Sequence, residues 1–254
     1  MKKPNEICFV DVHCHVEMIE LPLEQIIENA VKNGVNIMIA QGVNSKSNRK
    51  VLEIASEYKE IKVALGLYPI DALFLSEKEI DDEIDFIKKN KDKIVALGEV
   101  GIDFKEDEKE HEKQIGTFEK IVKLSFELNK PLIIHSRKAE KEIIDILEKH
   151  NAKKVIMHCF SGKLSLAKRI IEKKWFLTIP ASVKNSEHFQ KVIEIAPIEQ
   201  LFCETDSPYL HPDKKWPNEP ANVIESYKKI AEIKKMKIEE VRDKIFKNYE
   251  RLFV

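Results

Sequence analysis

Six residues able to ligate a metal ion stand at or just beyond the ends of short apolar runs that are widely spaced along the chain. They are His13, His15, Glu99, His135, His158 and Asp206. Imidazole and carboxylate groups together suit Zn²⁺, Mn²⁺, Fe²⁺ or Co²⁺, and a carboxylate can bridge two ions. The six residues therefore predict a metal-dependent catalytic site, provided that the fold brings the ends of the runs together.

The histidines carry most of this hypothesis. Four of the eight histidines belong to the set, whereas the other four fall in predicted helices or loops, where solvated histidines are expected. His13 and His15 are two apart on a predicted strand, so both imidazoles point to one face and Cys14 points to the other. Burying four histidines with two carboxylates costs free energy unless a cation compensates.

The number of ligands predicts two ions. Six ligands are more than one catalytic ion with an open position usually takes. We therefore expect two divalent ions, Mg²⁺, Mn²⁺ or Zn²⁺, that share a carboxylate. Glu99 is the predicted bridge because it comes from the middle of the order of runs.

The apolar runs predict strands that are buried on both faces, because they are short, rich in Ile and Val, and continuous rather than alternating. Eight runs have this character: 7–12, 35–40, 62–67, 94–97, 131–134, 154–157, 175–179 and 200–203. Between them, apolar residues recur at helical spacing in stretches such as 23–32, 108–129 and 138–150. Ser76 and Ser45 are predicted to open two further helices.

Eight strands that are each followed by a helix predict an α/β protein with a (β/α)₈ TIM-barrel fold, in a single domain over residues 1–254. The last helices, at about 220–233 and 238–253, are expected to complete the outer ring. An open doubly wound sheet is the rival, but it should carry a glycine-rich turn after its first strand. The first strand here leads instead into Asp-Val-His-Cys-His.

Composition excludes several other classes of protein. The formal net charge of −1 gives no overall basic field for coating duplex nucleic acid. No apolar run approaches the roughly 20 residues that span a bilayer, and residues 1–4 do not resemble a signal peptide. We therefore expect a soluble cytoplasmic protein with no obligate protein partner. The four cysteines show no disulfide or CxxC spacing and are expected to be small buried residues.

Five blocks, in order along nearly the whole chain, resemble the signature blocks of the TatD family of metal-dependent deoxyribonucleases, which have the amidohydrolase-like barrel fold. The blocks are Asp11-Val-His13-Cys-His15, Gly98-Glu99-Val-Gly-Ile-Asp103, Pro131-Leu-Ile-Ile-His135-Ser-Arg137, His158-Cys-Phe-Ser-Gly162 and Glu204-Thr-Asp206-Ser-Pro208.

The resemblance implies a role for each ligand. A first ion would lie on His13, His15 and Asp206, and a second on His135 and His158. Glu99 would bridge the two. The activity it implies is divalent-metal-dependent hydrolysis of phosphodiester bonds in DNA, often from the 3′ end.

Two features depart from the family pattern. The family commonly has Gly-x-His-Pro after the third strand, where this chain has Tyr68, which can donate a hydrogen bond but carries no positive charge. The usual arginine-rich loop after the eighth strand has Lys214 and Lys215 instead, which would offer point charges to phosphate rather than bidentate forks. Trp216 follows them; it either stacks on a base or packs the loop onto the barrel.

Four further polar residues flank the predicted ligands. Arg137, two residues after His135, either clamps a substrate phosphate or forms a surface ion pair. Glu204 lies on the same strand face as Asp206 and is expected to orient a ligand imidazole or hold a water. Asp11 is expected to accept hydrogen bonds beneath His13, and Asp103 to cap a loop.

The predicted reaction uses a water that two ions activate and orient, with Asp206 as the acceptor of its proton and Glu99 as the catalytic bridge. The alternative keeps the ions but changes the bond to an amide, an ester or a phosphotriester. A barrel that binds without catalysis is a third class, but all six ligands are present. DNA, single-stranded or at its ends, is the substrate that the resemblance implies.

Overall fold

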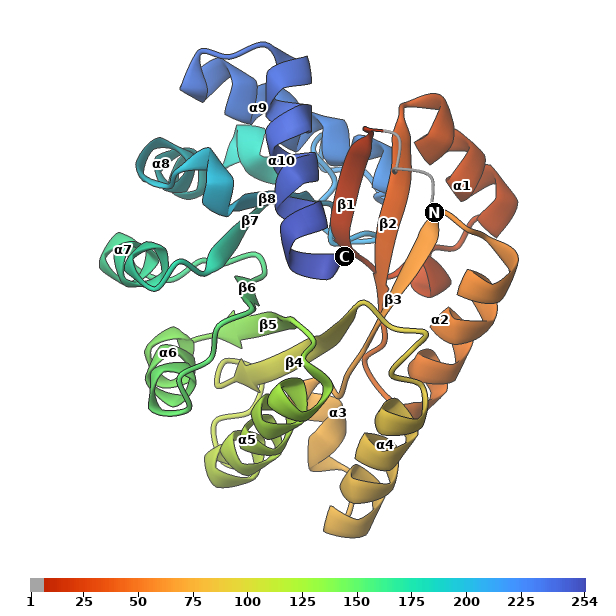
Figure 1. Ribbon diagram of the computed structural model, residues 1–254, viewed down its shortest axis with the longest axis vertical. Helices are drawn as coiled ribbons and strands as arrows, with labels where there is room; N and C mark the ends of the chain where they lie inside the picture. The colour runs from red at the N-terminus through yellow and green to blue at the C-terminus, as the bar shows by residue number, and fades with distance from the viewer. Residues whose placement is uncertain (1–6) are drawn as a thin grey trace.

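Eight parallel strands form one sheet in which each strand pairs with the next along the chain. In the computed structural model, which describes residues 7–254, the strands form the centre of the molecule (Figure 1). This architecture confirms the predicted barrel. The strands are β1 (Phe9–Cys14), β2 (Val35–Gln41), β3 (Ile61–Leu65), β4 (Ala96–Asp103), β5 (Leu132–Arg137), β6 (Val155–Met157), β7 (Phe176–Pro180) and β8 (Leu201–Glu204).

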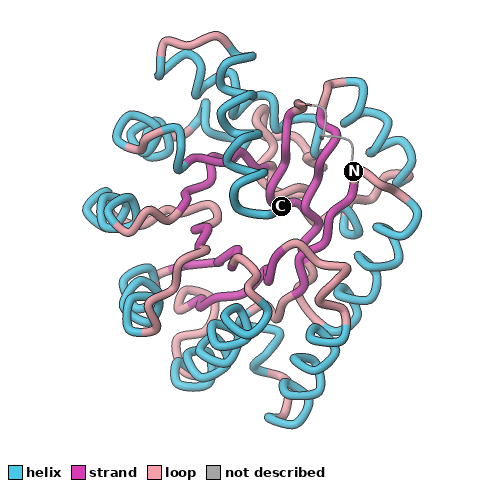
Figure 2. Tube along the Cα trace, viewed as in Figure 1, coloured by secondary structure: helices cyan, strands magenta, loops and turns pink. Residues whose placement is uncertain are grey.

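Helices follow every strand and surround the sheet (Figure 2). The α-helices are α1 (Leu23–Lys32), α2 (Ser45–Glu57), α3 (Pro69–Leu73), α4 (Glu77–Lys89), α5 (His111–Leu128), α6 (Glu140–Lys149), α7 (Leu164–Glu172), α8 (Glu187–Ile195), α9 (Ile224–Lys234) and α10 (Ile238–Phe253). Short 3₁₀ turns are η1 (Val16–Met18), η2 (Ala181–Asn185), η3 (Ile198–Gln200) and η4 (Pro220–Val223). Helices α1 and α10 have the predicted bounds, and the predicted helix at 220–233 divides into η4 and α9.

The helix starts show how local sequence sets the boundaries. Ser76 caps α4 as predicted: its hydroxyl accepts a hydrogen bond from the Glu79 amide, and the Glu79 carboxylate accepts one from the Ser76 amide. At α2 the capping residue is Asn44, whose side chain accepts from the Ser47 amide at 3.0 Å. Ser45 opens α2, as predicted. The cap before it is supplied by Asn44, a residue type that is as favourable at this position as serine.

Strand β4 is longer than predicted, because it continues through Glu99 to Asp103. The apolar run ends at Leu97, and the glycines and carboxylates beyond it hid the rest of the strand. Its register against β5 shifts between Leu97 and Val100. A shift of this kind re-aims side chains, and Glu99 is therefore a residue within the strand rather than at its end. Strand β5 likewise continues beyond its predicted end to Arg137.

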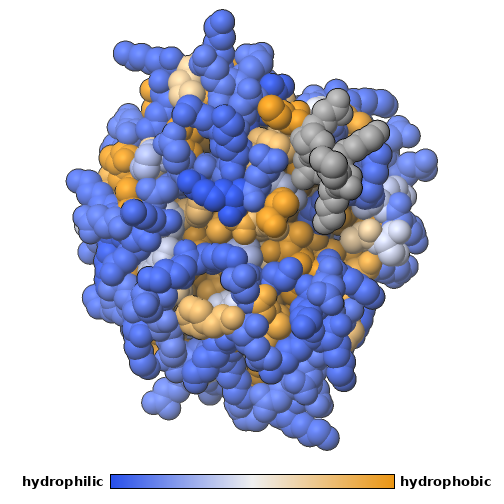
Figure 3. All heavy atoms as spheres, in the orientation of Figure 1, coloured by the Kyte–Doolittle hydropathy of each residue, from blue (hydrophilic) through white to orange (hydrophobic). Residues whose placement is uncertain are grey.

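Apolar residues of the strands and the inner faces of the helices form one continuous core. The outer surface is largely hydrophilic in Figure 3, with apolar side chains gathered towards the centre of the face shown. This distribution agrees with the charged fraction of 34%. Within residues 7–254, no helix combines the length and apolar character that crossing a membrane requires. The prediction about a signal peptide concerns residues 1–4, which lie outside the described residues.

Side chains complete the seam between β1 and β8. The Tyr227 hydroxyl, from α9, bonds both the amide and the carbonyl of Val10 at 3.0 Å. The buried Asp11 carboxylate accepts from the Thr205 amide at 3.0 Å and also from the Thr205 hydroxyl. Just after β8, the backbone amide of Asp206 donates a hydrogen bond to the carbonyl of His13 in β1, at 2.9 Å. These contacts fix the end of β1 against the end of β8.

At Gly101, β4 lies so close to β5 that there is no room for a side chain. Its φ is +153°, and a Cβ atom there would lie 1.9 Å from the carbonyl oxygen of His135. We expect Gly101→Ala to lower the free energy of unfolding by about 2–5 kcal/mol, through overpacking and backbone strain. Urea unfolding followed by circular dichroism measures the change.

Gly116 is the matched control, because it lies in α5 and a Cβ atom there would have no neighbour within 4 Å. Gly116→Ala should raise the free energy of unfolding by roughly 0.5–1 kcal/mol, the usual gain in a helix interior. Equal effects of the two substitutions would contradict this account of Gly101.

Candidate metal centre

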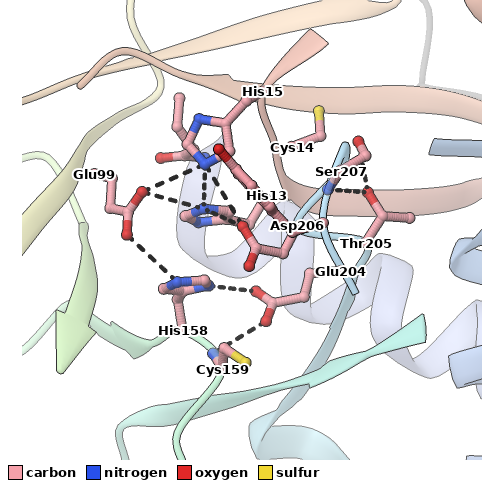
Figure 4. A network of polar contacts seen from close by, with 12 residues as sticks. His13, Cys14, His15, Glu99, His158, Cys159, Glu204, Thr205, Asp206 and Ser207 are labelled. Carbon is pink, nitrogen blue, oxygen red and sulfur yellow. Dashed lines mark hydrogen bonds and ion pairs between the residues drawn. The ribbon is translucent and has the colours of Figure 1, made fainter. Parts of the chain in front are cut away.

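All six predicted ligands converge inside one end of the barrel. Each comes from a different strand or from the residues just after it, except for the pair that β1 supplies. Four of them, His13, His15, Glu99 and His158, expose 5% or less of their surface. Figure 4 shows these four and Asp206 facing one another.

The first donor group contains His13, His15, Glu99 and Asp206. The Nε2 atoms of His13 and His15 are 3.2 Å apart. Glu99 Oε2 lies 3.6 and 3.4 Å from these two nitrogens, and Asp206 Oδ1 lies 3.5 and 3.6 Å from them. Ligands at about 2.0–2.1 Å from a tetrahedral cation are themselves about 3.3–3.4 Å apart. The separations of the two nitrogens from each other and from each carboxylate therefore match those between ligands of one divalent cation.

The second donor group uses the other oxygen of Glu99. Its Oε1 lies 2.9 Å from His135 Nδ1 and 3.5 Å from His158 Nε2. Each carboxylate oxygen of Glu99 therefore faces its own pair of histidines. These residues could hold a second cation beside the first, with Glu99 between them.

Two further carboxylates support the centre: Glu204 holds the imidazole of His158, and Asp11 holds the backbone of His13. Glu204 Oε2 lies 3.1 Å from His158 Nδ1, and the other Glu204 oxygen accepts from the Cys159 amide at 3.0 Å. Asp11 accepts from the His13 amide at 3.2 Å. Both occupy the positions that the sequence predicts for them.

Asp103 has a role that the sequence prediction missed. Its Oδ1 caps the following loop, as predicted, by accepting from the amides of Lys105 and Glu106. Its Oδ2 also lies 3.0 Å from His135 Nε2, and so fixes the ring whose Nδ1 faces Glu99. Alternation along β4 puts residues 99, 101 and 103 on one face. That spacing could have revealed Asp103 if the strand had been extended.

Cys14 points away from the centre, as alternation predicts, and its thiol donates to the carbonyl of Ile39. Cys159 lies beside the centre, but burial raises the pKa of its thiol well above the usual value, and the charge of Glu204 raises it further. The thiol therefore stays protonated, which disfavours it as a ligand.

The two buried carboxylates stay ionised because histidines surround them. Burial alone would raise the pKa of Glu99, but hydrogen bonds from the four histidines hold it well below its ordinary value. Burial would also raise the pKa of Asp206, which the hydrogen bond from His15 and the nearby imidazole charges lower instead. Glu99 and Asp206 are therefore both negatively charged, which is the form that binds cations.

Three of the four histidines have raised pKa values in the metal-free protein, whereas burial and the charge of His158 lower the pKa of His13. Burial lowers the pKa of His15, but hydrogen bonds to Asp206 and Glu99 outweigh it and raise the pKa to about 10. Burial likewise opposes the protonation of His158, and the charge of Glu204 raises its pKa well above the ordinary value. A cation must displace these protons, because it binds the same nitrogen atoms.

A cavity of about 720 Å³ opens onto the centre. Arg137 and Tyr68, both predicted to contact substrate, line it. Arg137 Nη1 lies 3.7 Å from Asp103 Oδ2 and 3.9 Å from Glu106 Oε2, and the Tyr68 hydroxyl donates to the same two carboxylates. Lys214 is exposed on the loop after β8, outside the set of cavity-lining residues.

Comparison with known proteins agrees with this geometry. The family model described as TatD related DNase matches residues 10–254. The chain belongs to the TatD family. It is 36% identical over 251 residues to an uncharacterized metal-dependent hydrolase of Methanocaldococcus jannaschii, covering 98% of each chain. It is 31% identical over 259 residues to deoxyribonuclease TATDN3 of Homo sapiens, covering 96% of this chain and 94% of that protein.

Solved structures of TatD-family proteins have the same fold as this chain. A TatD homologue from Escherichia coli superposes with a TM-score of 0.90 at 25% identity, over 98% of this chain and 99% of that one. A TatD-family hydrolase from Entamoeba histolytica superposes with a TM-score of 0.86 at 21% identity, over 97% and 98%, and supports the fold. This TatD protein is a metal-dependent hydrolase.

Proton release provides a test of the metal centre in this TatD protein. Because the pKa of His15 is raised to about 10, cation binding near neutral pH should expel protons. The affinity for Zn²⁺ or Mn²⁺ should therefore rise with pH up to about that value. Titration calorimetry of the metal-free protein in two buffers of different ionisation enthalpy measures the protons released, and equal heats in both buffers would contradict the prediction.

Asp103→Asn tests the support of His135. Loss of the carboxylate should weaken cation binding about 10–100-fold, the usual effect of removing such a partner. Chelator competition measures the affinity. Asp107→Asn is the matched control, since Asp107 also caps amides of the same loop, those of Lys109 and Glu110. An equal loss of affinity in the control would refute a specific role for Asp103.

Proposed function

We propose that this TatD protein is a divalent-metal-dependent deoxyribonuclease that hydrolyses phosphodiester bonds with two cations, removing nucleotides from the 3′ end of DNA. The chemistry of the centre supports the type of reaction. The names of relatives, such as deoxyribonuclease TATDN3 of Homo sapiens, support DNA as the substrate. The 3′ polarity rests on the resemblance of the five sequence blocks.

The observation that carries the proposal is the two-sided position of Glu99. One oxygen faces the pair His13 and His15, and the other faces His135 and His158. A carboxylate shared in this way is typical of centres with two ions, which are common among phosphatases and nucleases. When bound, two cations supply an activated water and stabilise charge on the attacking and leaving oxygens.

Asp206 is the proposed proton acceptor. It lines the cavity, and 18% of its side chain is exposed, so it can reach a water there. Its lowered pKa means that it is ionised at neutral pH and free to accept a proton. Its φ of +53° is a left-handed conformation that the backbone bond to His13 O holds in place. Strained conformations of this kind gather at functional sites.

Arg137 is the proposed clamp for a substrate phosphate. Its guanidinium is about half exposed, at 46% of the side chain, and lies in the cavity wall. The separations of 3.7 and 3.9 Å from its two carboxylate partners leave its hydrogen-bonding capacity available. Tyr68 adds a neutral donor, because burial raises the pKa of its hydroxyl and the charges of Glu99 and Asp103 raise it further.

The charge balance suits a local grip on DNA rather than a coating of duplex. A net charge of −1 supplies no long-range attraction to polyanions. Recognition must then depend on the centre itself and on Arg137. A cavity of about 720 Å³ lies within the range that small ligands occupy, which agrees with entry of a strand end.

Glu99→Ala and His158→Ala test the proposal. Each removes a ligand of the centre, and the rate of release of nucleotides from end-labelled single-stranded DNA should fall by about 10³ or more. Circular dichroism and the melting temperature should show that the barrel remains folded. Unchanged nuclease rates in either folded variant would exclude the assigned centre.

A substrate panel separates the proposal from its rivals. The wild type is incubated with DNA, RNA, a carboxylic ester and a phosphotriester, with Mn²⁺ or with a chelator. Metal-dependent hydrolysis confined to DNA supports the proposal. Hydrolysis of only the small esters would replace it with the alternative hydrolase, and no hydrolysis of any substrate would leave a binding barrel.

A further inference from the structure

The loop after β8 holds two neighbouring aromatic side chains, of which Tyr209 lines the cavity and Trp216 lies beside Tyr209. Tyr209 exposes 50% of its surface and Trp216 exposes 59%. Their ring centroids are 5.8 Å apart, with an angle of 58° between the planes. The other tryptophan, Trp175, is 2% exposed in the core. Trp216 therefore does not pack the loop onto the barrel, which was one of the two roles considered for it from the sequence.

Hydrogen bonds fix the loop that carries these rings. The Asn218 side chain donates to Thr205 O at 2.9 Å and to Tyr209 O at 2.7 Å. The Asn218 amide donates to Pro208 O at 2.8 Å, and the Asn185 side chain donates to Pro212 O at 2.7 Å. The aromatic pair is therefore presented to solvent by an ordered loop. A preorganised ring loses little conformational freedom when it binds a ligand.

Tyr209 connects the pair to the metal centre. Its amide donates to the carbonyl of Asp206 at 2.9 Å, and its side chain lines the same cavity as Asp206, Glu99 and Arg137. A ligand that places a phosphate at the centre would therefore place its adjoining group beside the ring of Tyr209. Leu210, which also lines the cavity, adds apolar surface beside it.

We infer that Tyr209 and Trp216 form a stacking subsite for a nucleobase of the nucleotide whose phosphate lies at the metal centre. A planar base matches exposed aromatic faces, and stacking of this kind tolerates any base. The chemistry of the cavity selects this occupant, because it joins a phosphate-binding centre to an aromatic surface. The inference rests on the proposed function for its role in catalysis, but not for the binding of a nucleotide.

Trp216→Ala tests the role in catalysis. With single-stranded DNA, KM should rise about tenfold, while kcat changes by less than about twofold. The difference from wild type should vanish when the terminal nucleotide is abasic, because no base remains to stack.

Phe74→Ala is the matched control. Phe74 is 83% exposed between α3 and α4. It does not line the cavity and, within residues 7–254, has no ring contact with a cavity-lining residue, whereas Trp216 contacts Tyr209. KM for DNA should be the same as in wild type. An equal rise of KM in both variants, or an unchanged KM in Trp216→Ala, overturns the inference, and so does a loss that persists with the abasic substrate.

Tryptophan fluorescence tests the subsite without catalysis. Deoxyadenosine monophosphate, with Mg²⁺ present, should quench Trp216, whereas deoxyribose 5-phosphate should not, because it lacks the base. Trp175 is buried and provides the constant background. Equal quenching by both compounds overturns the inference. If wild type leaves DNA intact but the nucleotide alone quenches Trp216, the proposed function fails and the stacking subsite stands.

Discussion

The contact between the first and last strands is the constraint on which the metal centre depends. β1 and β8 meet through the buried Asp11 carboxylate, which binds the His13 amide and two groups of Thr205. Next to this contact, the backbone amide of Asp206 donates a hydrogen bond to the carbonyl of His13. Since His13 lies on one side of the seam and Asp206 on the other, their geometry is set by the closure of the barrel and not by a local motif.

The centre also shows how a barrel interior can hold many ionisable groups. An isolated buried charge is costly, and one that is paired and hydrogen-bonded is much less so. Glu99 is balanced by imidazoles on both sides, His135 is held between Glu99 and Asp103, and His158 lies between Glu99 and Glu204. Each charge has partners of opposite sign, so the protein retains this geometry before cations bind.

The sequence predicted that these six side chains come together, because few residue types ligate metals and the strand ends of a barrel meet at one edge. It failed where apolar periodicity carries no information. Beyond Leu97, β4 consists of glycines, a carboxylate and short apolar residues, so its true end and the second contact of Asp103 were missed. The exposure of Trp216 depends on a loop held by Asn218, a contact that no local pattern indicates.

The seam at Thr205 joins residues 194 apart in the sequence. Contacts of such separation carry a large loop-closure entropy, and they form only when the six strands between β1 and β8 have assembled. His13 and Asp206 cannot share a cation until that has happened. A cation bound to both would link β1 to the residue after β8, and its binding would stabilise the folded barrel by mass action. Metal supply and folding would then be coupled, and starvation for the ion would weaken the barrel as well as its activity.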